Sequence, residues 1–235
     1  MGDVLFVIVI YNISKEKSVA WQSVSSLLGK DAERSIYLHD NTEQNSYLAQ
    51  VYNNALSYAR QNGFKWIALL DSDTKITADY LEAIQQVTQK SAGDTVYCPV
   101  LSTVDGTHLS PFTAYGFKVA FNSGLLIPVK IFDTITSFNE EYPLDYLDYW
   151  FCYQLHKNGM NLETLPVTLN HSLSVMDYSQ MPRWRYLSLL DAEKRFAKEI
   201  HREKYYRLLL FGRWIKWQLT GHPFAHETYE AFIKR

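Results

Sequence analysis

Cysteine is scarce in this chain of 235 residues, which contains only two. Cys98 and Cys152 lie far apart in the sequence, each in apolar surroundings. A disulfide framework or a zinc site would need more cysteines at closer and more regular spacings. The sequence therefore excludes a disulfide-rich scaffold and predicts two buried free thiols.

Long hydrophobic runs are also missing. The longest apolar run near the start covers residues 4–10, whereas a helix needs about 20 apolar residues to cross a bilayer. No basic segment precedes this run, as one would in a secretory signal peptide. We therefore expect the protein to stay in the cytoplasm.

Charge is nearly balanced overall but unevenly distributed. The formal net charge is −2, yet residues 1–180 contain 11 Lys and Arg against 19 Asp and Glu, and residues 181–235 contain 12 against 6. The acidic body would repel nucleic-acid phosphates, so nucleic-acid binding is a poor hypothesis. With 47% hydrophobic residues, the chain has the composition of a globular protein.

Strands and helices alternate through the first third of the chain. A continuous apolar run predicts a buried strand over 4–10, two further strands are predicted over 35–39 and 66–70, and helical spacing of apolar residues predicts helices over 18–28 and 47–62. This alternation is typical of an α/β fold, with a mostly parallel, doubly wound sheet flanked by helices. The rest of the sequence predicts helices over 78–90, 131–138 and 149–158, strands over 95–100 and 161–168, a loop-rich segment over 101–126, and helices from residue 182.

Polar residues follow each of the three early strands. They are Tyr11 and Asn12, Asp40 and Asn41, and the Asp71-Ser72-Asp73 cluster. Ligands of doubly wound sheets bind beyond the carboxyl ends of the strands. We therefore expect all three clusters to face one crevice.

The segment 67–74, IALLDSDT, sets two carboxylates two positions apart directly after a buried strand. Asp71 could be the nucleophile of a haloacid-dehalogenase-type phosphatase, with Asp73 as its general acid. Alternatively, the pair could bind a divalent ion that neutralises the diphosphate of a nucleotide sugar. Asp73 and Thr74 could also simply cap the next helix. The phosphatase motif sits on the first strand of its fold, whereas this one ends the third strand.

A long downstream segment distinguishes between these chemistries. Residues 122–174 read NSGLLIPVKIFDTITSFNEEYPLDYLDYWFCYQLHKNGMNLETLPVTLNHSLS. Together with VIVIYN, HDN and LLDSDT before it, this segment resembles family 2 glycosyltransferases of the GT-A fold, in particular the rhamnosyltransferase-like branch. The resemblance covers residues 4–174, with every landmark in order.

This resemblance implies a division of the chain. The GT-A catalytic domain, with a Rossmann-like central sheet, would cover 1–178. Its nucleotide-sugar binding half would cover 1–100, and its acceptor and catalytic-base half 101–178. Residues 179–235 would form a basic, aromatic, helical extension.

The resemblance also implies donor-binding residues. In this family a tyrosine after the first strand stacks on the donor base and an aspartate after the second strand hydrogen-bonds it; these positions match Tyr11 and Asp40. A carboxylate that accepts from a ring N–H favours uracil or thymine. Asn12, Asn41 and Asn53 match polar positions near the nucleotide, although asparagine also serves turns. Tyr11 could instead be a turn aromatic packed on the sheet.

A metal site for Mn²⁺ or Mg²⁺ is implied as well. Asp73 matches the metal-binding carboxylate, and Asp71 would lie near the ribose or in the metal shell. His171 matches a histidine that many GT-A enzymes use as a further ligand. A shell of oxygen and imidazole leans towards Mn²⁺. A lone histidine is nevertheless more often structural than ligating, so both interpretations of His171 stay open.

The catalytic base implied by the resemblance is Asp148, found by counting back from Gly159 to the family's acidic segment. A single displacement at the anomeric carbon needs one such carboxylate opposite the leaving diphosphate. Asp145 matches an acceptor-binding aspartate, and it is also a candidate rival base or helix N-cap. Trp150 replaces an acidic residue of the family; it either stacks on an acceptor sugar or anchors the helix in the core.

Residues 181–235 alternate cationic residues with aromatic or aliphatic ones, as in Arg213-Trp214-Ile215-Lys216-Trp217. Such helices suit the anionic inner face of the plasma membrane, where they would meet a lipid-linked glycan acceptor. The alternative is that they pack on the catalytic domain with their charges in water.

The residues and the resemblance together predict an inverting, metal-dependent glycosyltransferase. It would move a sugar from a dTDP- or UDP-sugar, with dTDP-rhamnose as the best single choice, to a glycan acceptor. The process would be bacterial surface polysaccharide synthesis, either O-antigen or capsule. The alternatives are a phosphatase with Asp71 as nucleophile and a non-catalytic glycan-binding module.

Overall fold

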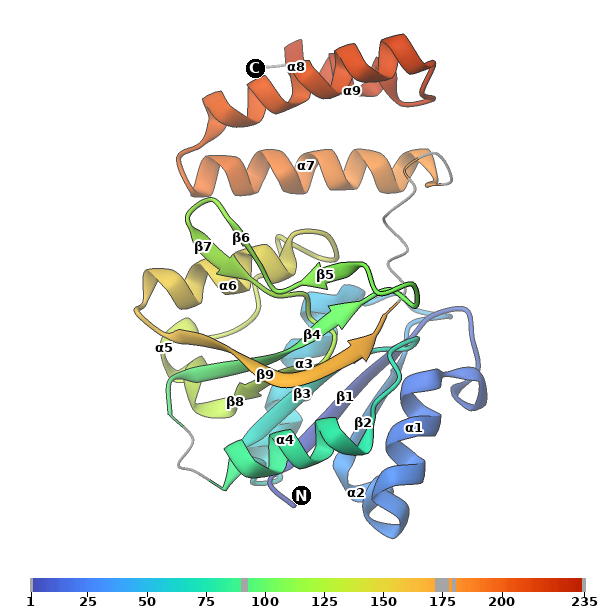
Figure 1. Cartoon of the computed structure of the whole chain (residues 1–235), viewed down its shortest axis with the longest axis vertical. Coiled ribbons are helices and arrows are strands. Elements are labelled where there is room, and N and C mark those ends of the chain that lie inside the picture. Colours follow the sequence, from blue (N-terminus) through green and yellow to red (C-terminus); the bar gives the residue numbers. More distant parts are fainter. Residues whose placement is uncertain (1, 90–92, 172–177, 179–180, 234–235) are drawn as a thin grey trace. The chain divides into compact units, whose positions relative to one another are not determined.

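The computed structural model describes residues 2–89, 93–171, 178 and 181–233 (Figure 1). The chain forms two compact units, Met1–Ser172 and Leu173–Arg235. Residue 179, where the predicted helical extension begins, lies outside the described residues.

The first unit begins with three parallel strands. β1 (Val4–Ile10) pairs with both β2 (Ile36–Asp40) and β3 (Trp66–Asp71). The connections contain α1 (Val19–Leu28), α2 (Ala32–Ser35) and α3 (Tyr47–Gln61), with 3₁₀ turns at Lys15–Lys17 and Gly29–Asp31. All seven residues of β1 are apolar and buried, which explains why its sequence shows no alternation.

The second half of this unit completes the sheet. After α4 (Ala78–Thr88) come β4 (Thr95–Ser102), β8 (Leu125–Pro128) and β9 (Asn161–Asn170). β8 is antiparallel to both β3 and β4, whereas β9 runs parallel to β4. The strand order is β2-β1-β3-β8-β4-β5, with β9 beside β4. The predicted α/β fold with a mostly parallel sheet is confirmed, with β8 and β5 (His108–Ser110) as the antiparallel strands.

Two predictions in the middle of the chain are wrong in detail. Residues 101–126 contain, besides β5, a hairpin of β6 (Phe112–Ala114) and β7 (Phe117–Val119). Strands of three residues are too short to show an alternating pattern. The predicted helix over 131–138 is a 3₁₀ turn at Val129–Ile131 followed by the single turn of α5 (Phe132–Ile135). Helix α6 (Leu147–Lys157) is present as predicted.

The strand register gathers the polar strand ends at one edge of the sheet. Ile10 pairs with Asp40 between β1 and β2, and Val9 pairs with Asp71 between β1 and β3. Tyr11, Asp40 and Asp71 therefore leave the sheet side by side. The two cysteines, Cys98 and Cys152, are buried and free, as predicted.

The second unit consists of α7 (Arg183–Glu199), α8 (Glu203–Thr220) and α9 (Ala225–Ile233). The Tyr186 ring stacks on Phe224 at 4.6 Å, and its hydroxyl contacts the Thr228 hydroxyl at 2.7 Å. Arg213 donates two hydrogen bonds to Glu193, at 3.0 and 2.8 Å. Part of the basic, aromatic pattern thus forms the interior of this unit. Across the described residues, no helix combines the length and apolarity needed to cross a membrane.

The Arg213–Glu193 pair should stabilise the second unit, because only 21% and 7% of the two side chains are exposed. Arg213→Met would leave Glu193 charged and buried, so we expect a loss of about 3 kcal/mol in the free energy of unfolding, measured by urea denaturation. Lys65→Met, which removes the exposed ion pair with Asp3, is the control and should cost less than about 1 kcal/mol. Equal losses in the two variants would contradict a stabilising role for the buried pair.

Candidate metal centre and active site

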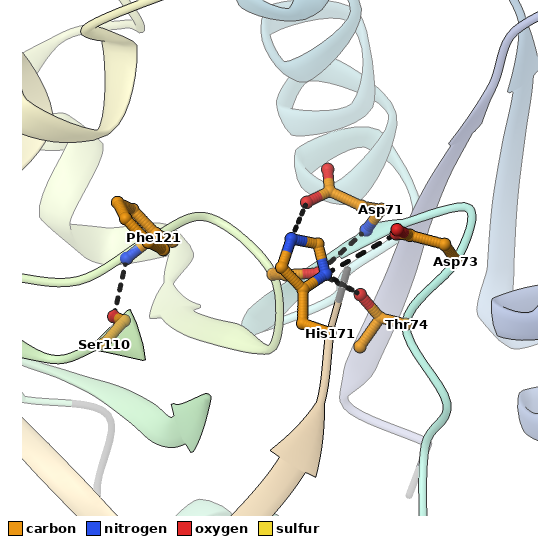
Figure 2. A network of polar contacts seen from close by, with 7 residues as sticks. Asp71, Asp73, Thr74, Ser110, Phe121 and His171 are labelled. Carbon is orange, nitrogen blue, oxygen red and sulfur yellow. Dashed lines mark hydrogen bonds and ion pairs between the residues drawn. The ribbon is translucent and has the colours of Figure 1, made fainter. Parts of the chain in front are cut away.

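Asp71, Asp73 and His171 form a cluster with the chemistry of a metal site (Figure 2). One ligand atom from each lies within 4.8 Å of the other two. The His171 side chain is 5% exposed, whereas those of Asp71 and Asp73 are 35% and 42% exposed. The imidazole therefore forms the buried wall of the cluster, and the carboxylates face solvent.

Strand order brings these residues together from distant parts of the sequence. Asp71 is the last residue of β3, and His171 follows the end of β9. Between β3 and β9 lie β8 and β4. The backbone N–H of His171 donates to the Ser102 carbonyl at the end of β4, at 2.9 Å. This bond extends the β4–β9 pairing by one residue and places the imidazole beside the carboxylates.

The two ring nitrogens of His171 face different carboxylates. Nε2 lies 3.8 Å from Asp71 Oδ2, and Nδ1 lies 3.5 Å from Asp73 Oδ1. Nδ1 also lies 3.1 Å from the Thr74 hydroxyl (Figure 2). Two carboxylates and an imidazole are ligand types that Mn²⁺ and comparable divalent ions accept. The donor set fits a divalent metal ion, in agreement with the predicted cofactor.

Two buried hydroxyl groups support the cluster, and the sequence did not predict this role for either. Ser123 accepts a hydrogen bond from the Asp71 backbone N–H at 3.2 Å, and its hydroxyl also contacts that of Thr74. Ser123 and Thr74 are fully buried. The sequence signal that could have pointed to Ser123 is the Asn122-Ser123-Gly124 tripeptide, which serves above only as a landmark of the family resemblance. Thr74 and Ser123 thus connect the backbone of Asp71 with the ring of His171.

Gly124 is required at the next position for steric reasons. Its φ is +79°, and a Cβ atom there would lie 2.6 Å from Cγ of Pro99. Its N–H donates to the Leu69 carbonyl on β3 at 2.7 Å, and its carbonyl accepts from the Tyr80 hydroxyl at 2.8 Å. Close approach of this turn to β3 is what puts Ser123 under Asp71.

The capping interpretation of Asp73 and Thr74 is wrong. Helix α4 is capped by Thr77, whose side chain accepts a hydrogen bond from the Tyr80 backbone N–H at 3.2 Å. Asp73 is therefore not used by the helix that follows it. Burial raises the pKa of Asp71; His171 opposes the rise and the Asp73 carboxylate adds to it. The neighbouring negative charges favour a cation at this place.

Asp148 lies in the first turn of α6. Burial raises its pKa to about 7; the hydrogen bond from the Tyr149 N–H, at 2.8 Å, opposes the rise, and the carboxylates of Asp145 and Asp71 contribute to it. A carboxyl group with a pKa near 7 can take up and release a proton at physiological pH. The predicted role of Asp148 as catalytic base stays a prediction.

The neighbours of Asp148 have different roles. Asp145 is 9% exposed, and it is not the N-cap of α6, because that position belongs to Tyr146, with φ +63° and no side-chain capping bond. Trp150 is 6% exposed and its ring stacks on Tyr142 at 6.4 Å. These contacts agree with the core-anchor interpretation of Trp150. The predicted acceptor contacts of Asp145 and Trp150 stay predictions.

Tyr11 and Asp40 stand at the edge of the sheet near Asp71. Tyr11 is 54% exposed, so it is not packed on the sheet. Hydrogen bonds from Thr42 lower the pKa of Asp40, which keeps this exposed carboxylate ionised. Asn12 and Asn41 hold the two turns: the Asn12 N–H donates to the Thr42 hydroxyl, and the Asn41 N–H donates to the Ile10 carbonyl.

The side chain of Asn53 lies on α3 and is bound to another loop. Its amide donates to the Phe138 carbonyl at 3.0 Å and to Glu140 at 3.1 Å, and its carbonyl accepts from the Phe138 N–H at 2.8 Å. These contacts give Asn53 a structural role, and its predicted contact with a nucleotide stays a prediction. Asn41 is similarly occupied, because its side-chain oxygen accepts from the Ser46 N–H at 3.0 Å.

Solved structures of other proteins show which fold this chain has. No protein-family model and no curated protein matches the chain. Among solved structures, it is similar to the mannosyltransferase PcManGT from Pyrobaculum calidifontis in complex with GDP-Man and Mn²⁺, with 14% identity, a TM-score of 0.55, and coverage of 98% of this chain and 73% of that one. It is also similar to GalNAc-T7 with UDP, GalNAc and Mn²⁺, with 12% identity and a TM-score of 0.54.

The alignment with GalNAc-T7 covers 81% of this chain but only 47% of GalNAc-T7. A third similar structure is a Drosophila β1,4-galactosyltransferase 7 mutant in complex with manganese, UDP-Gal and xylobiose, with 13% identity, a TM-score of 0.50 and coverage of 79% of each chain. The chain has the GT-A fold that these glycosyltransferases share, as the sequence resemblance predicts. The rhamnosyltransferase-like branch stays a prediction.

The raised pKa of Asp148 should make the stability of the metal-free protein depend on pH. Unfolded chains ionise this carboxyl near pH 4, whereas the folded protein does so at about 7. Its contribution to stability therefore falls as pH rises from about 4 to 7 and is constant above that range. Asp148→Asn removes this cost, so we expect its Tm to match the wild type near pH 4 and to exceed it by about 5–10 °C at pH 8.

Thermal unfolding at several pH values measures this difference. Asp79→Asn, which neutralises an exposed carboxylate in the first turn of α4, is the matched control and should show no such trend. A gain for Asp148→Asn that did not change with pH would contradict a partly buried carboxyl group with a raised pKa at this position.

Proposed function

We propose that this protein is a metal-dependent glycosyltransferase that uses a nucleotide-sugar donor. The observation that carries the proposal is the Asp71, Asp73 and His171 cluster, which lies at the sheet edge that Tyr11 and Asp40 also reach. The GT-A fold of the chain supports it, because three similar structures contain Mn²⁺ or manganese with a nucleotide or nucleotide sugar.

In this proposal Asp73, Asp71 and His171 hold a Mn²⁺ or Mg²⁺ ion. The bound ion would neutralise the diphosphate and stabilise it as a leaving group. Thr74 and Ser123 hold the backbone of Asp71 and the ring of His171 from the buried side. Asp71, at the end of β3, would also lie near the ribose of the donor.

Tyr11 and Asp40 would bind the base of the donor. The exposed Tyr11 ring offers a stacking surface, and the ionised Asp40 carboxylate accepts a hydrogen bond from a ring N–H. Uracil and thymine present such an N–H, so we propose a UDP- or dTDP-sugar. Asn12, Asn41 and Asn53 would then act mainly by shaping the turns around the nucleotide.

Asp148 would be the general base. Its carboxylate takes the proton of the acceptor hydroxyl while the acceptor oxygen bonds to the anomeric carbon, and the bond from that carbon to the diphosphate breaks with its electron pair on the leaving group. A single displacement of this kind inverts the anomeric configuration. The pKa of about 7 suits this role, because the group is ionised in part of the molecules at neutral pH and still binds a proton well.

The finer assignments rest on the sequence resemblance. They are dTDP-rhamnose as donor, a lipid-linked glycan acceptor contacted by Asp145 and Trp150, and a place in O-antigen or capsule synthesis. The phosphatase alternative has less support, because His171 and Asp73 flank Asp71 as ligands would. A glycan-binding module without activity would not need a carboxyl group with a raised pKa at Asp148.

Donor binding should depend on the metal cluster. With Mn²⁺ present, UDP or dTDP at about 100 times its Kd should stabilise the wild type by about 3 kcal/mol, seen as a rise in Tm of several degrees. Asp73→Asn and His171→Ala should strongly reduce the rise in Tm that the nucleotide causes in the presence of Mn²⁺. Tyr11→Ala should reduce the rise in Tm that the nucleotide causes, both with and without Mn²⁺. Asp79→Asn is the control. If no nucleotide raised the Tm of the wild type in the presence of Mn²⁺, the donor site would be wrong.

Asp148→Asn should separate chemistry from binding. We expect kcat to fall by about 10²–10⁴-fold, whereas the Tm rise caused by UDP or dTDP with Mn²⁺ stays as in the wild type. In the wild type, activity should rise with pH as Asp148 loses its proton, with an acid limb near pH 7 in the free enzyme. Full transfer activity in Asp148→Asn would show that another group acts as the base.

A further inference from the structure

Helix α8 has apolar side chains on more sides than those that pack against α7 and α9. One side faces α7: the Tyr206 hydroxyl donates to the Leu190 carbonyl at 3.0 Å, and Arg213 pairs with Glu193. Tyr206, Leu210 and Trp217 are buried on this side. Burial of these residues explains why α8 packs against α7. It accounts for only part of the apolar residues of α8.

A second side of α8 faces α9. The Arg207 guanidinium lies 5.6 Å from the centre of the Phe232 ring, and the Phe211 ring lies 5.4 Å from the same ring. The Trp214 ring lies 5.0 Å from Tyr229. These contacts occupy the sector of α8 next to the first, so two adjacent sides of the helix are packed within the second unit.

The remaining side of α8 carries large apolar residues in contact with solvent. Leu208, Ile215 and Leu219 are 69%, 40% and 83% exposed. At 100° per residue they fall within a sector of about 40°, and Leu209, 42% exposed, lies about 80° beyond one edge of that sector. A helix that is apolar on nearly all sides is normally covered on all of them. Exposed leucines aligned in this way therefore indicate a surface with an occupant.

Charge indicates the kind of occupant. Lys204 and Lys216 are exposed and flank the apolar sector, about 20° and about 60° outside its two edges at 100° per residue. The acidic residue of α8 is Glu203, at its first position. A second copy of the chain would bring the lysines of one α8 near those of the other, which is unfavourable. An anionic lipid surface instead offers hydrocarbon to the leucines and phosphates to the lysines.

We propose that this leucine-lysine face of α8, made of Lys204, Leu208, Leu209, Ile215, Lys216 and Leu219, binds the surface of an anionic membrane. The helix lies in the plane of the bilayer, with the leucines at the boundary between headgroups and acyl chains and the lysines at lipid phosphates. The second unit thereby attaches the protein to the membrane without crossing it. This binding does not depend on the chemistry of the Asp71 cluster.

Vesicle flotation of the full chain tests the proposal. We expect the wild type to float with vesicles of phosphatidylcholine mixed with phosphatidylglycerol, and to bind vesicles of phosphatidylcholine alone about tenfold more weakly or worse. The triple variant Leu208→Gln, Ile215→Gln, Leu219→Gln should lose about tenfold or more of the binding to the anionic vesicles. Val104→Gln, which changes an 85% exposed apolar residue of the first unit, should bind as the wild type does.

The lysines have their own matched control. Lys204→Gln with Lys216→Gln should weaken binding to the anionic vesicles by about tenfold. Lys194→Gln with Lys198→Gln changes the net charge equally, on exposed positions of α7, and should have a much smaller effect. Circular dichroism and the Tm of each variant check that the helices stay folded, and the Tm rise with UDP and Mn²⁺ checks the donor site separately.

Three results would overturn the proposal. One is binding of the leucine triple variant at the wild-type level. Another is equal weakening by the two lysine pairs, which would indicate general attraction by the basic unit. The third is a wild type that binds neither kind of vesicle; if it then formed dimers that the leucine changes abolished, the occupant of the face would be a second copy of the chain.

Discussion

Negative charge at the end of strand β3 is the constraint around which this structure is arranged. Asp71 and Asp73 place their carboxylates close together, and burial raises the pKa of Asp71. Partly buried like charges are unfavourable unless a proton or a cation is shared between them. His171 lies between the two carboxylates, and the buried hydroxyls of Thr74 and Ser123 hold it and the Asp71 backbone. The same arrangement that relieves the repulsion is a ligand set for a divalent ion.

The antiparallel strand β8 connects this cluster to the rest of the sheet. It lies between β3 and β4, and the turn before it contains Ser123 and Gly124. Only a glycine fits where the turn passes Pro99. Because β9 pairs with β4 on the far side, β8 and β4 together set the position of His171 relative to the end of β3. The position of the metal-ligand set therefore depends on the turn at Ser123 and Gly124, where a residue larger than glycine at position 124 would clash with Pro99.

The two units differ in how they use charge. In the first unit, three carboxylates with shifted pKa values lie near the metal cluster or at the strand ends: the pKa of Asp71 and of Asp148 is raised, and that of Asp40 is lowered, so Asp40 stays ionised. In the second unit, Arg213 forms a buried ion pair with Glu193, whereas Lys204 and Lys216 are exposed on α8. Net charge alone does not distinguish these uses. The difference bears on the proposed membrane binding, because only surface cations can contact lipid phosphates.

The sequence by itself determined the early strands, the free thiols, and the adjacency of Asp71 and Asp73, because apolar runs and local spacing are properties of neighbouring residues. It also suggested His171 and Asp148, through resemblance. Tertiary structure decided what those residues contact. Thr74 and His171 are 97 positions apart, and Asn53 and Phe138 are 85 apart. Such contacts follow from strand order and turn geometry, which a local sequence pattern does not contain. The burial of Trp150 and the exposure of the leucines on α8 were likewise decided by the tertiary structure.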